Sequence, residues 1–314
     1  MKVIEFLEKA NSTLFSYEII PPQRGGDIRQ VFRLVDELIQ YEPPFIDLTS
    51  RSAEVYYEDL PDGSVRRHIK RKRPGTIGLS AALKNRYSVE TVPHILCSGF
   101  TQQETEDALI ELAYLGIDNV LAVRGDELRK RLPSQNKTYN TYAVDLVKQI
   151  VNMNQGIYLE DLVDAHPTDF CIGVGGYPEK HFEAPNLETD LSNLKAKVDA
   201  GADYIVTQMC FDNSAYFRFV EACRGIGIDV PIIPGIKILT RETHLTSIPR
   251  NFFVDIPNAL VEKVRGQDRE TVYREGLNWA LNQVQELVDA KVPCVHFYIM
   301  SSATEVAQVV SQFK

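Results

Sequence analysis

One repeating pattern constrains the fold of this chain more than any other feature. An amphipathic helical segment, a short turn and an apolar run that ends in polar residues follow one another from end to end. Nearly continuous apolar runs are typical of parallel strands covered on both faces. We therefore expect eight strands, at residues 14–22, 45–51, 91–97, 119–126, 170–178, 204–211, 231–239 and 294–301.

The segments between these runs have the period of amphipathic helices. Residues 27–41, 104–115, 187–200 and 270–290 each place apolar side chains on one face. Three turns carry a glycine two residues before an aspartate, at Gly116, Gly201 and Gly227, where a helix can end in a left-handed residue.

Eight strand–helix units in order predict an α/β fold, a single (β/α)₈ TIM barrel over residues 1–314. An open doubly wound sheet is the alternative, but eight consecutive parallel strands favour closure. We also expect an N-terminal helix at about residues 2–11. A long basic insertion is expected at about residues 52–74, after the second strand. Its run at residues 66–73 is interpreted as a solvated face, with phosphate or polyanion binding as the alternative.

Composition excludes several functional classes. The chain has 34 Lys and Arg against 43 Asp and Glu, a net charge of −9, which argues against nucleic acid as the partner. It lacks an apolar run long enough to span a membrane, and its N-terminus does not resemble a signal peptide. Five scattered cysteines and histidines without ligand spacing indicate a reduced cytoplasmic protein with no metal site.

Active sites of (β/α)₈ barrels lie at the carboxyl ends of the strands, which directs attention to the polar residues there. Glu18 lies in the apolar stretch F-S-Y-E-I-I-P-P. Removal from water would raise the pKa of such a carboxyl group and suit it to general acid catalysis near neutral pH. The alternative is a buried glutamate paired with a core arginine.

Three further strand ends carry candidate residues. Arg124 and Asp126 flank a glycine in A-V-R-G-D, an arrangement that allows close approach to an anionic ligand. The loop Y-P-E-K-H-F-E-A-P-N begins at Tyr177 and includes His181, so its rings suit a planar ligand. Gln208 has an amide that fits the edge of a heterocycle, or it is a satisfied core amide.

The helix after this loop places Asn193 and Lys197 on one face, where Lys197 is suited to a phosphate. A solvated helix face is the alternative. The glycines of G-V-G-G lie inside a strand and do not open a helix, so the chain lacks a Rossmann dinucleotide motif.

The ordered motifs resemble those of the methylenetetrahydrofolate reductase family across almost the whole chain. They are F-S-Y-E-I-I-P-P, V-P-H-I-L-C, A-V-R-G-D, G-Y-P-E-K-H, L-K-A-K-V-D-A-G-A-D, V-T-Q-M-C-F-D, I-P-G-I and H-F-Y. The resemblance implies an FAD-containing barrel of the short bacterial form. It also implies reduction of 5,10-methylenetetrahydrofolate to 5-methyltetrahydrofolate with NADH or NADPH, which supplies methyl groups for methionine, and a homo-oligomer.

The resemblance also implies residue roles. Glu18 matches the glutamate that protonates N10, and Asp126 matches the aspartate that favours the cation formed on ring opening. Gln208 matches the glutamine that contacts the folate ring. The implied FAD contacts are Thr49, His94, Arg124, Asp126, Tyr177, His181, Asp190, Asn193, Lys197 and Ala202.

The sequence departs from the family at three strand ends. Arg51 stands where many members have a small residue, K-I-L-T-R-E-T lacks a phenylalanine that stacks on substrate, and I-M-S-S lacks an arginine near the folate tail. We expect Arg51 or the basic run to compensate. Two other functions stay open: another barrel flavoprotein, such as a proline dehydrogenase-like oxidase, and a non-catalytic folate-binding subunit of a methyl-transfer complex.

Overall fold

The structure is a computed structural model that describes residues 1–50, 54–70, 75–125, 138–299 and 302–314. Eight parallel strands close into a barrel in the order β1-β10-β9-β8-β7-β6-β5-β2, which confirms the predicted (β/α)₈ architecture. The barrel strands are β1 (Leu14–Ile19), β2 (Phe45–Leu48), β5 (Glu90–Leu96), β6 (Asn119–Val123), β7 (Cys171–Gly176), β8 (Tyr204–Met209), β9 (Ile232–Ile236) and β10 (Cys294–Ile299).

All eight predicted strands are present, but each ends before its predicted last residue. Some of the residues that follow the strands are polar, such as Thr49 after β2 and Arg124 after β6, and they lie beyond the last residue of the strand at the mouth of the barrel. Parallel pairing places the carboxyl ends of all eight strands at that one mouth.

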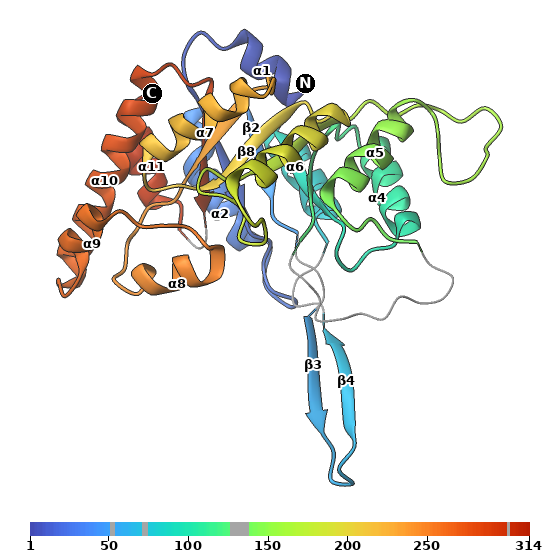
Figure 1. Cartoon of the computed structure of the whole chain (residues 1–314), viewed down its shortest axis with the longest axis horizontal. Helices are drawn as coiled ribbons and strands as arrows, with labels where there is room; N and C mark the ends of the chain where they lie inside the picture. The colour runs from blue at the N-terminus through green and yellow to red at the C-terminus, as the bar shows by residue number, and fades with distance from the viewer. Residues whose placement is uncertain (51–53, 71–74, 126–137, 300–301) are drawn as a thin grey trace.

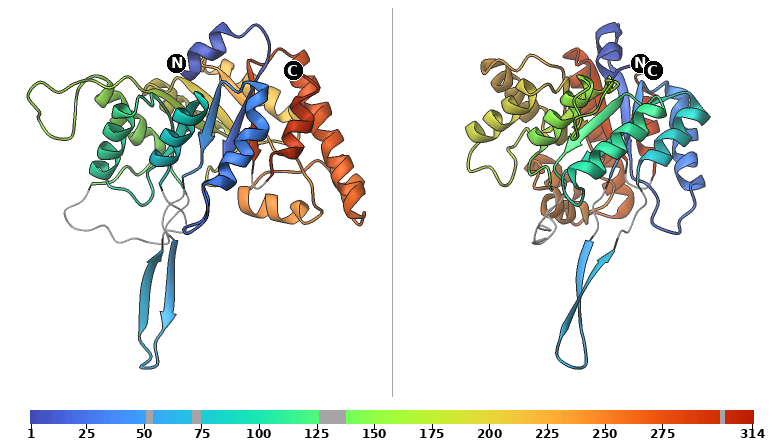
Figure 2. Two further views of the ribbon diagram at one scale, coloured as in Figure 1. Left: turned by 180° about the vertical axis from the view of Figure 1, so that it is seen from behind. Right: turned by 90° about the vertical axis from the view of Figure 1, so that its right-hand side faces the viewer.

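Helices surround the barrel on its outer side, and the first of them covers the amino ends of the strands (Figures 1 and 2). They are α1 (Val3–Lys9), α2 (Arg29–Leu38), α3 (Ile77–Tyr87), α4 (Gln102–Tyr114), α5 (Ala143–Asn154), α6 (Leu187–Asp199), α7 (Asn213–Gly225), α8 (His244–Phe252), α9 (Asn258–Val264), α10 (Arg269–Asp289) and α11 (Thr304–Val310), with a 3₁₀ turn at Ile39–Tyr41. None of the helices in the described part of the chain has the length and apolar character needed to cross a membrane.

The predicted helix ends are confirmed by their backbone conformation. Gly116, Gly201 and Gly227 have φ values of 64°, 115° and 76°, which side chains rarely adopt. At the opposite end of α4, the hydroxyl of Thr101 accepts a hydrogen bond from the amide of Glu104, whose carboxylate accepts one from the amide of Thr101. This capping box fixes where the helix begins.

The barrel interior changes from apolar to polar along its axis. At the amino ends of the strands, alternate side chains form one apolar cluster, which Val3 and Leu7 of α1 cover. Toward the carboxyl ends, the alternation brings Ser16, Asp47 and His296 inward, and all three are buried. A buried polar layer therefore lies directly beneath the mouth, where a catalytic site is expected.

An antiparallel hairpin extends from the body of the molecule (Figures 1 and 2). Its strands are β3 (Glu54–Asp59) and β4 (Val65–Lys70), so Arg66 of the predicted basic run belongs to a strand. Arg51 and the end of that run, residues 71–73, lie outside the described residues.

Candidate active site at the barrel mouth

Glu18 lies at the centre of the mouth, on β1. The parallel register sets it beside Tyr298 of β10 and Asp47 of β2. Its Oε1 atom accepts a hydrogen bond of 2.6 Å from Oγ1 of Thr49, and its side chain is 14% exposed. A mostly buried carboxylate with a small accessible part can exchange a proton with a ligand above it.

Two histidines face the other oxygen of Glu18. Nε2 of His94 is 3.7 Å from Oε2 of Glu18, and Nε2 of His296 is 3.8 Å from the same atom. Both imidazoles are buried, and neither Nε2 atom has a hydrogen-bond partner among the described residues. Nδ1 of His296 lies 2.8 Å from the hydroxyl of Ser16, which holds that ring in place.

A second carboxylate lies below this group. Asp47 is fully buried, and its Oδ1 atom is 3.6 Å from Nε2 of His94. Neither of its carboxylate oxygens has a hydrogen-bond partner among the residues that the structure describes. One imidazole is therefore placed between two acids, an arrangement in which a proton on His94 is attracted from both sides.

The electrostatics correct one prediction made from the sequence. Burial alone would raise the pKa of Glu18, but His94, His296 and the Thr49 hydroxyl outweigh it and lower the pKa to about 2. Burial likewise disfavours the charged form of His94, yet Glu18 and Asp47 together raise its pKa. The expected raised pKa of Glu18 is therefore wrong for the ligand-free protein, because the sequence did not show that two histidines surround it.

A large cavity of about 720 Å³ adjoins the mouth at β6, β7 and α6. Its volume is in the range of small-molecule and cofactor sites. Predicted site residues gathered in its lining are Arg124, Tyr177, His181, Asp190, Asn193 and Lys197. These residues come from two strand ends, the loop after β7 and one helix face, so the fold brings together what the sequence separates.

Ion pairing and ring contacts order one wall of this cavity. The two terminal guanidinium nitrogens of Arg124 donate hydrogen bonds to the carboxylate of Glu183, and this pairing lowers the pKa of that carboxyl group. The rings of Tyr177 and His181 meet edge to face at 4.6 Å, and the amide of His181 donates to Asp190. Burial lowers the pKa of His181, which favours the neutral ring.

Lys197 provides the positive charge at the floor of the cavity. Its Nζ atom donates a hydrogen bond of 2.6 Å to the carbonyl of Gly175, and burial lowers its pKa to about 8. A Cβ atom on Gly175 would meet no atom within 4 Å except the Tyr177 hydroxyl, at 3.8 Å. The backbone of β7 is therefore open to the cavity beside a buried cation.

These features fit a flat, anionic cofactor such as FAD. The cavity offers Tyr177 and His181 for the ring system and two cations, Arg124 and Lys197, for a diphosphate. Asp190 acts on Lys197 at longer range, but no ion pair within 4 Å involves Lys197 in the described part of the chain, so an anion there would compensate its charge further.

The remaining predicted residues lie elsewhere. Thr49 and His94 contact Glu18 instead of lining the large cavity, and Ala202 is buried outside the lining. Gln208 lies near the end of β8, where Oε1 accepts a hydrogen bond from the amide of Met209. Its amide nitrogen has no partner among the described residues and is available to a ligand. Asp126 lies outside the described residues.

Sequence reasoning missed two residues of this site and one long-range contact of the loop after β7. Asp47 is a single acid inside the apolar stretch F-I-D-L, the same signal that identified Glu18. His296 belongs to H-F-Y, which served only as a family motif. Burial raises the pKa of Glu179, in the loop after β7, to about 7, and its carboxylate accepts a hydrogen bond from the amide of Asp255. Asp255 follows α8, and no local pattern connects it with Glu179.

Comparison with known proteins identifies relatives along the whole chain. The family model described as "Methylenetetrahydrofolate reductase" matches residues 2–314. Methylenetetrahydrofolate reductase (NADH) 1 of Arabidopsis thaliana is 30% identical over 96% of this chain and 49% of its own length. The 5,10-methylenetetrahydrofolate reductase of Escherichia coli is 30% identical over 92% of this chain and 86% of its own length. The chain thus spans about half of the plant relative and most of the bacterial one.

Solved structures support the fold. An uncharacterised protein from Clostridium thermocellum, described as binding two copies of 5-methyl-5,6,7,8-tetrahydrofolic acid, has a TM-score of 0.59 and 12% sequence identity. The match covers 98% of this chain and 96% of that protein. At this identity the likeness concerns the barrel fold alone.

Proposed function

The chain belongs to the methylenetetrahydrofolate reductase family, and from that premise we propose that it reduces 5,10-methylenetetrahydrofolate to 5-methyltetrahydrofolate. NADH or NADPH is the proposed hydride donor and FAD the proposed carrier. The observation that carries the proposal is the placement of Glu18 at the barrel mouth, with two histidines against one of its oxygens and a cofactor-sized cavity nearby.

In the proposed site, the cofactor and the proton donor lie on different sides of the mouth. Around the closed sheet, β2 and β5 separate Glu18 on β1 from the cavity at β6 and β7. FAD, when bound, would accept hydride from the nicotinamide nucleotide and deliver it to the folate. Tyr177, His181, Arg124 and Lys197 would hold it, and Gln208 on β8 would offer its amide to the folate ring.

Glu18 handles the proton in this proposal. Protonation of N10 opens the five-membered ring of the substrate to a reactive 5-iminium cation, which makes the carbon electrophilic toward hydride. Because the pKa of Glu18 is about 2 in the free protein, the proton is held first on His94, whose pKa is raised. A folate ring over the mouth excludes the remaining water from Glu18 and raises its pKa, which moves the proton from Nε2 of His94 to Oε2 of Glu18 and then to N10.

Two residues support this transfer without contacting the substrate. The Thr49 hydroxyl donates to Oε1 of Glu18, which leaves Oε2 as the oxygen that receives the proton. Asp47 faces Nε2 of His94 from below and stabilises the protonated imidazole. Asp126, which follows Gly125 at the mouth, is proposed to favour the substrate cation through its negative charge.

Spectroscopy under anaerobic conditions tests the proposed function. Purified protein incubated with FAD should retain a flavin absorbance spectrum after gel filtration, bleach with NADH or NADPH, and recover its colour on addition of methylenetetrahydrofolate. Recovery with proline-derived substrates instead would favour the oxidase alternative. Protein that binds tetrahydrofolate but neither retains FAD nor turns over would favour a non-catalytic folate-binding subunit and contradict the proposal.

A further inference from the structure

His296 lies at the barrel mouth but takes no part in the proton transfer described above. Its side chain is 1% exposed, and its Nε2 atom lies 3.8 Å from Oε2 of Glu18. A buried imidazole in this position is a cation, a neutral donor or a neutral acceptor toward the carboxylate, depending on which ring nitrogens carry protons. The hydrogen bonds beneath the ring distinguish these three states.

The barrel sets His296 in a row of inward side chains on β1 and β10. Ser16 of β1 is in register with His296 of β10. Alternate residues of a strand face the same side, so Cys294 lies below this pair and Glu18 lies above it. Cys294, Ser16 and His296 are all buried, so their polar groups find partners within the protein.

Two hydrogen bonds link the buried row. Sγ of Cys294 donates to Oγ of Ser16 over 3.4 Å, and Oγ of Ser16 lies 2.8 Å from Nδ1 of His296. Burial raises the pKa of the Cys294 thiol to about 12, so the thiol keeps its proton and remains a donor. The row therefore begins at its lower end with a hydrogen-bond donor.

The proton of the Ser16 hydroxyl decides the state of the ring. Within the described part of the chain, the acceptors in its reach are Nδ1 of His296 and the thiol sulfur of Cys294. A proton on Nδ1 would force the hydroxyl to donate to the sulfur, which is a weak acceptor. The thiol would then turn to the carbonyl of Val295, at the longer distance of 3.7 Å. The stronger set of bonds leaves Nδ1 without a proton.

The single ring proton is then on Nε2, which faces Glu18. The opposite tautomer would direct a lone pair at a negatively charged oxygen, which is repulsive. At 3.8 Å the contact is longer than a hydrogen bond, so it acts through electrostatic attraction and contributes to the lowered pKa of Glu18. Such contacts often shorten when a substrate binds.

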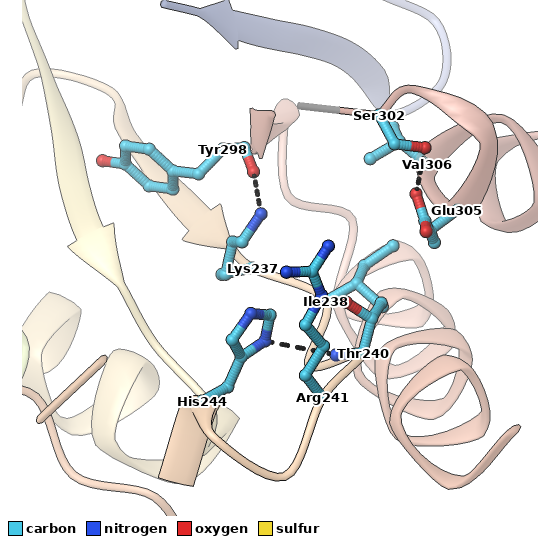
Figure 3. Close-up of a pocket in the computed structure, with 9 residues that line it drawn as sticks. All are labelled: Lys237, Ile238, Thr240, Arg241, His244, Tyr298, Ser302, Glu305 and Val306. Atoms are coloured by element: carbon cyan, nitrogen blue, oxygen red, sulfur yellow. Dashed lines mark hydrogen bonds between the residues drawn. The ribbon is translucent and has the colours of Figure 1, made fainter. Parts of the chain in front are cut away.

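The end of β10 keeps the ring in this orientation. The rings of His296 and Tyr298 meet edge to face at 5.2 Å. The Tyr298 hydroxyl donates to the carbonyl of Thr207 over 2.7 Å, and the Tyr298 carbonyl accepts a hydrogen bond of 2.9 Å from Nζ of Lys237 (Figure 3). A small cavity of about 210 Å³ lies beside this contact, and its basic lining residues are Lys237, Arg241 and His244 (Figure 3).

We propose that His296 is a positioning residue for Glu18, held as the neutral tautomer that directs its Nε2 proton at Oε2. Ser16 imposes this tautomer, and Cys294 orients the Ser16 hydroxyl. The N–H group disfavours a proton on Oε2 and fixes the direction in which this oxygen faces. The proton thus stays on His94 until the substrate covers the mouth. The tautomer is independent of the substrate, and only its kinetic consequence rests on the proposed function.

NMR of ¹⁵N-histidine-labelled protein tests the tautomer in the absence of flavin and folate. The His296 signals are assigned by their loss in His296→Gln. At neutral pH we expect a proton on Nε2 of His296 and none on Nδ1. In Ser16→Ala, part of the population should carry a proton on Nδ1, and Ser16→Thr should restore the wild-type pattern. A protonated Nδ1 in the wild type would overturn the proposal.

Thr91→Val is the matched control for Ser16→Ala. Thr91 also carries a buried hydroxyl on a barrel strand, β5, but this hydroxyl has no hydrogen-bond partner among the described residues. Its removal should leave the His296 signals unchanged. A change as large as that in Ser16→Ala would show that the signals report general packing of the barrel, which would contradict the role of Ser16.

The effect on Glu18 is measured by ¹³C NMR titration of its carboxyl group. His296→Leu removes the N–H group and should raise the pKa of Glu18, whereas His296→Gln keeps an amide donor and should raise it less. An unchanged Glu18 titration in His296→Leu would overturn the positioning role.

Stopped-flow kinetics separates this inference from the proposed reaction. We expect Ser16→Ala to slow reoxidation by methylenetetrahydrofolate about tenfold or more, with reduction of bound FAD by NADH unchanged. Ser16→Thr should recover most of the loss. Reoxidation of Ser16→Ala at the wild-type rate would overturn the positioning role. The expected tautomer in a wild-type protein that does not reduce the folate would overturn only the proposed reaction.

Discussion

Oε2 of Glu18 lies 3.7 Å from Nε2 of His94, at the top of a barrel interior that is apolar below and polar at the mouth. The separation suits an ion pair better than a direct hydrogen bond. Each group changes the protonation of the other: the imidazole lowers the pKa of the carboxyl group, and the carboxylate raises the pKa of the imidazole. In the proposed mechanism, the proton is held on the histidine until a ligand covers the acid.

This pairing predicts a contribution to stability that is largest at mildly acidic pH. The pKa of Glu18 falls from its ordinary 4.5 to about 2, so its contribution is complete above 4.5 and is lost as the pH falls toward 2. The pKa of His94 is raised above 6.5, so its contribution is complete below 6.5 and is lost as the pH rises through the raised value. The pair therefore stabilises the fold most between about pH 4.5 and 6.5.

Urea unfolding of wild type and Glu18→Gln at several pH values measures this contribution. The difference in free energy of unfolding should be largest in that window, with a pH-dependent part on the order of 1–3 kcal/mol. Glu8→Gln, an exposed glutamate without a hydrogen-bond or ion-pair partner among the described residues, serves as control. A Glu18→Gln difference that stays constant with pH would show that the two groups do not interact.

Asp47→Asn should lower the pKa of His94, because it removes one of the two carboxylates that favour the protonated ring. NMR titration of the His94 imidazole measures the change directly. If His94 supplies the proton, the alkaline limit of the folate half-reaction should move to lower pH by the same amount. Asp229→Asn, a substitution of an exposed residue far along the chain, should change neither the pKa of His94 nor the alkaline limit of the folate half-reaction. An unchanged His94 titration would remove Asp47 from the account.

Lys197→Met should weaken FAD binding by about tenfold or more, because it removes a buried cation from the large cavity while keeping most of the side-chain volume. Fluorescence titration of the apoprotein with FAD measures this loss. Lys195→Met is the matched control on the same helix, since Lys195 pairs with Asp199 and does not line the cavity. Similar affinities for the two variants would place the flavin phosphates elsewhere.

Gly235→Ala should destabilise the barrel by about 1–3 kcal/mol. A Cβ atom there would lie 2.4 Å from the carbonyl oxygen of Thr207 and 2.6 Å from Cε2 of Tyr298, so the substitution forces the Tyr298 ring out of place. Gly225→Ala, on α7 with no atom within 4 Å of the added Cβ, should be neutral or stabilising. Denaturant unfolding measures the free energy of unfolding of both variants. Equal values for Gly235→Ala and Gly225→Ala would show that the mouth accommodates the methyl group.

Much of the architecture follows from local patterns. The apolar runs predict eight strands because each run is typical of a parallel strand that is buried on both faces. The ends of these strands then locate the mouth, where Glu18, Arg124 and Gln208 lie. The family motifs lead to the residues that line the large cavity.

Relations between distant segments were not accessible in this way. The direction of the Glu18 pKa depends on His94 and His296, which β5 and β10 bring to it only when the barrel closes. The contact of Glu179 with Asp255 and the gathering of Lys237, Arg241 and His244 around one cavity likewise depend on how loops fold over the mouth. The residue types alone do not predict these contacts between residues that are far apart in the sequence.

The central claim is that Glu18 supplies the proton for reduction of the folate. The direct measurement is a stopped-flow comparison of the two half-reactions for wild type and Glu18→Gln, reduction of bound FAD by NADH and reoxidation by methylenetetrahydrofolate. We expect Glu18→Gln to bind FAD and to be reduced at the wild-type rate, with reoxidation slower by about 10²–10⁴-fold. Reoxidation of Glu18→Gln at the wild-type rate would contradict the account.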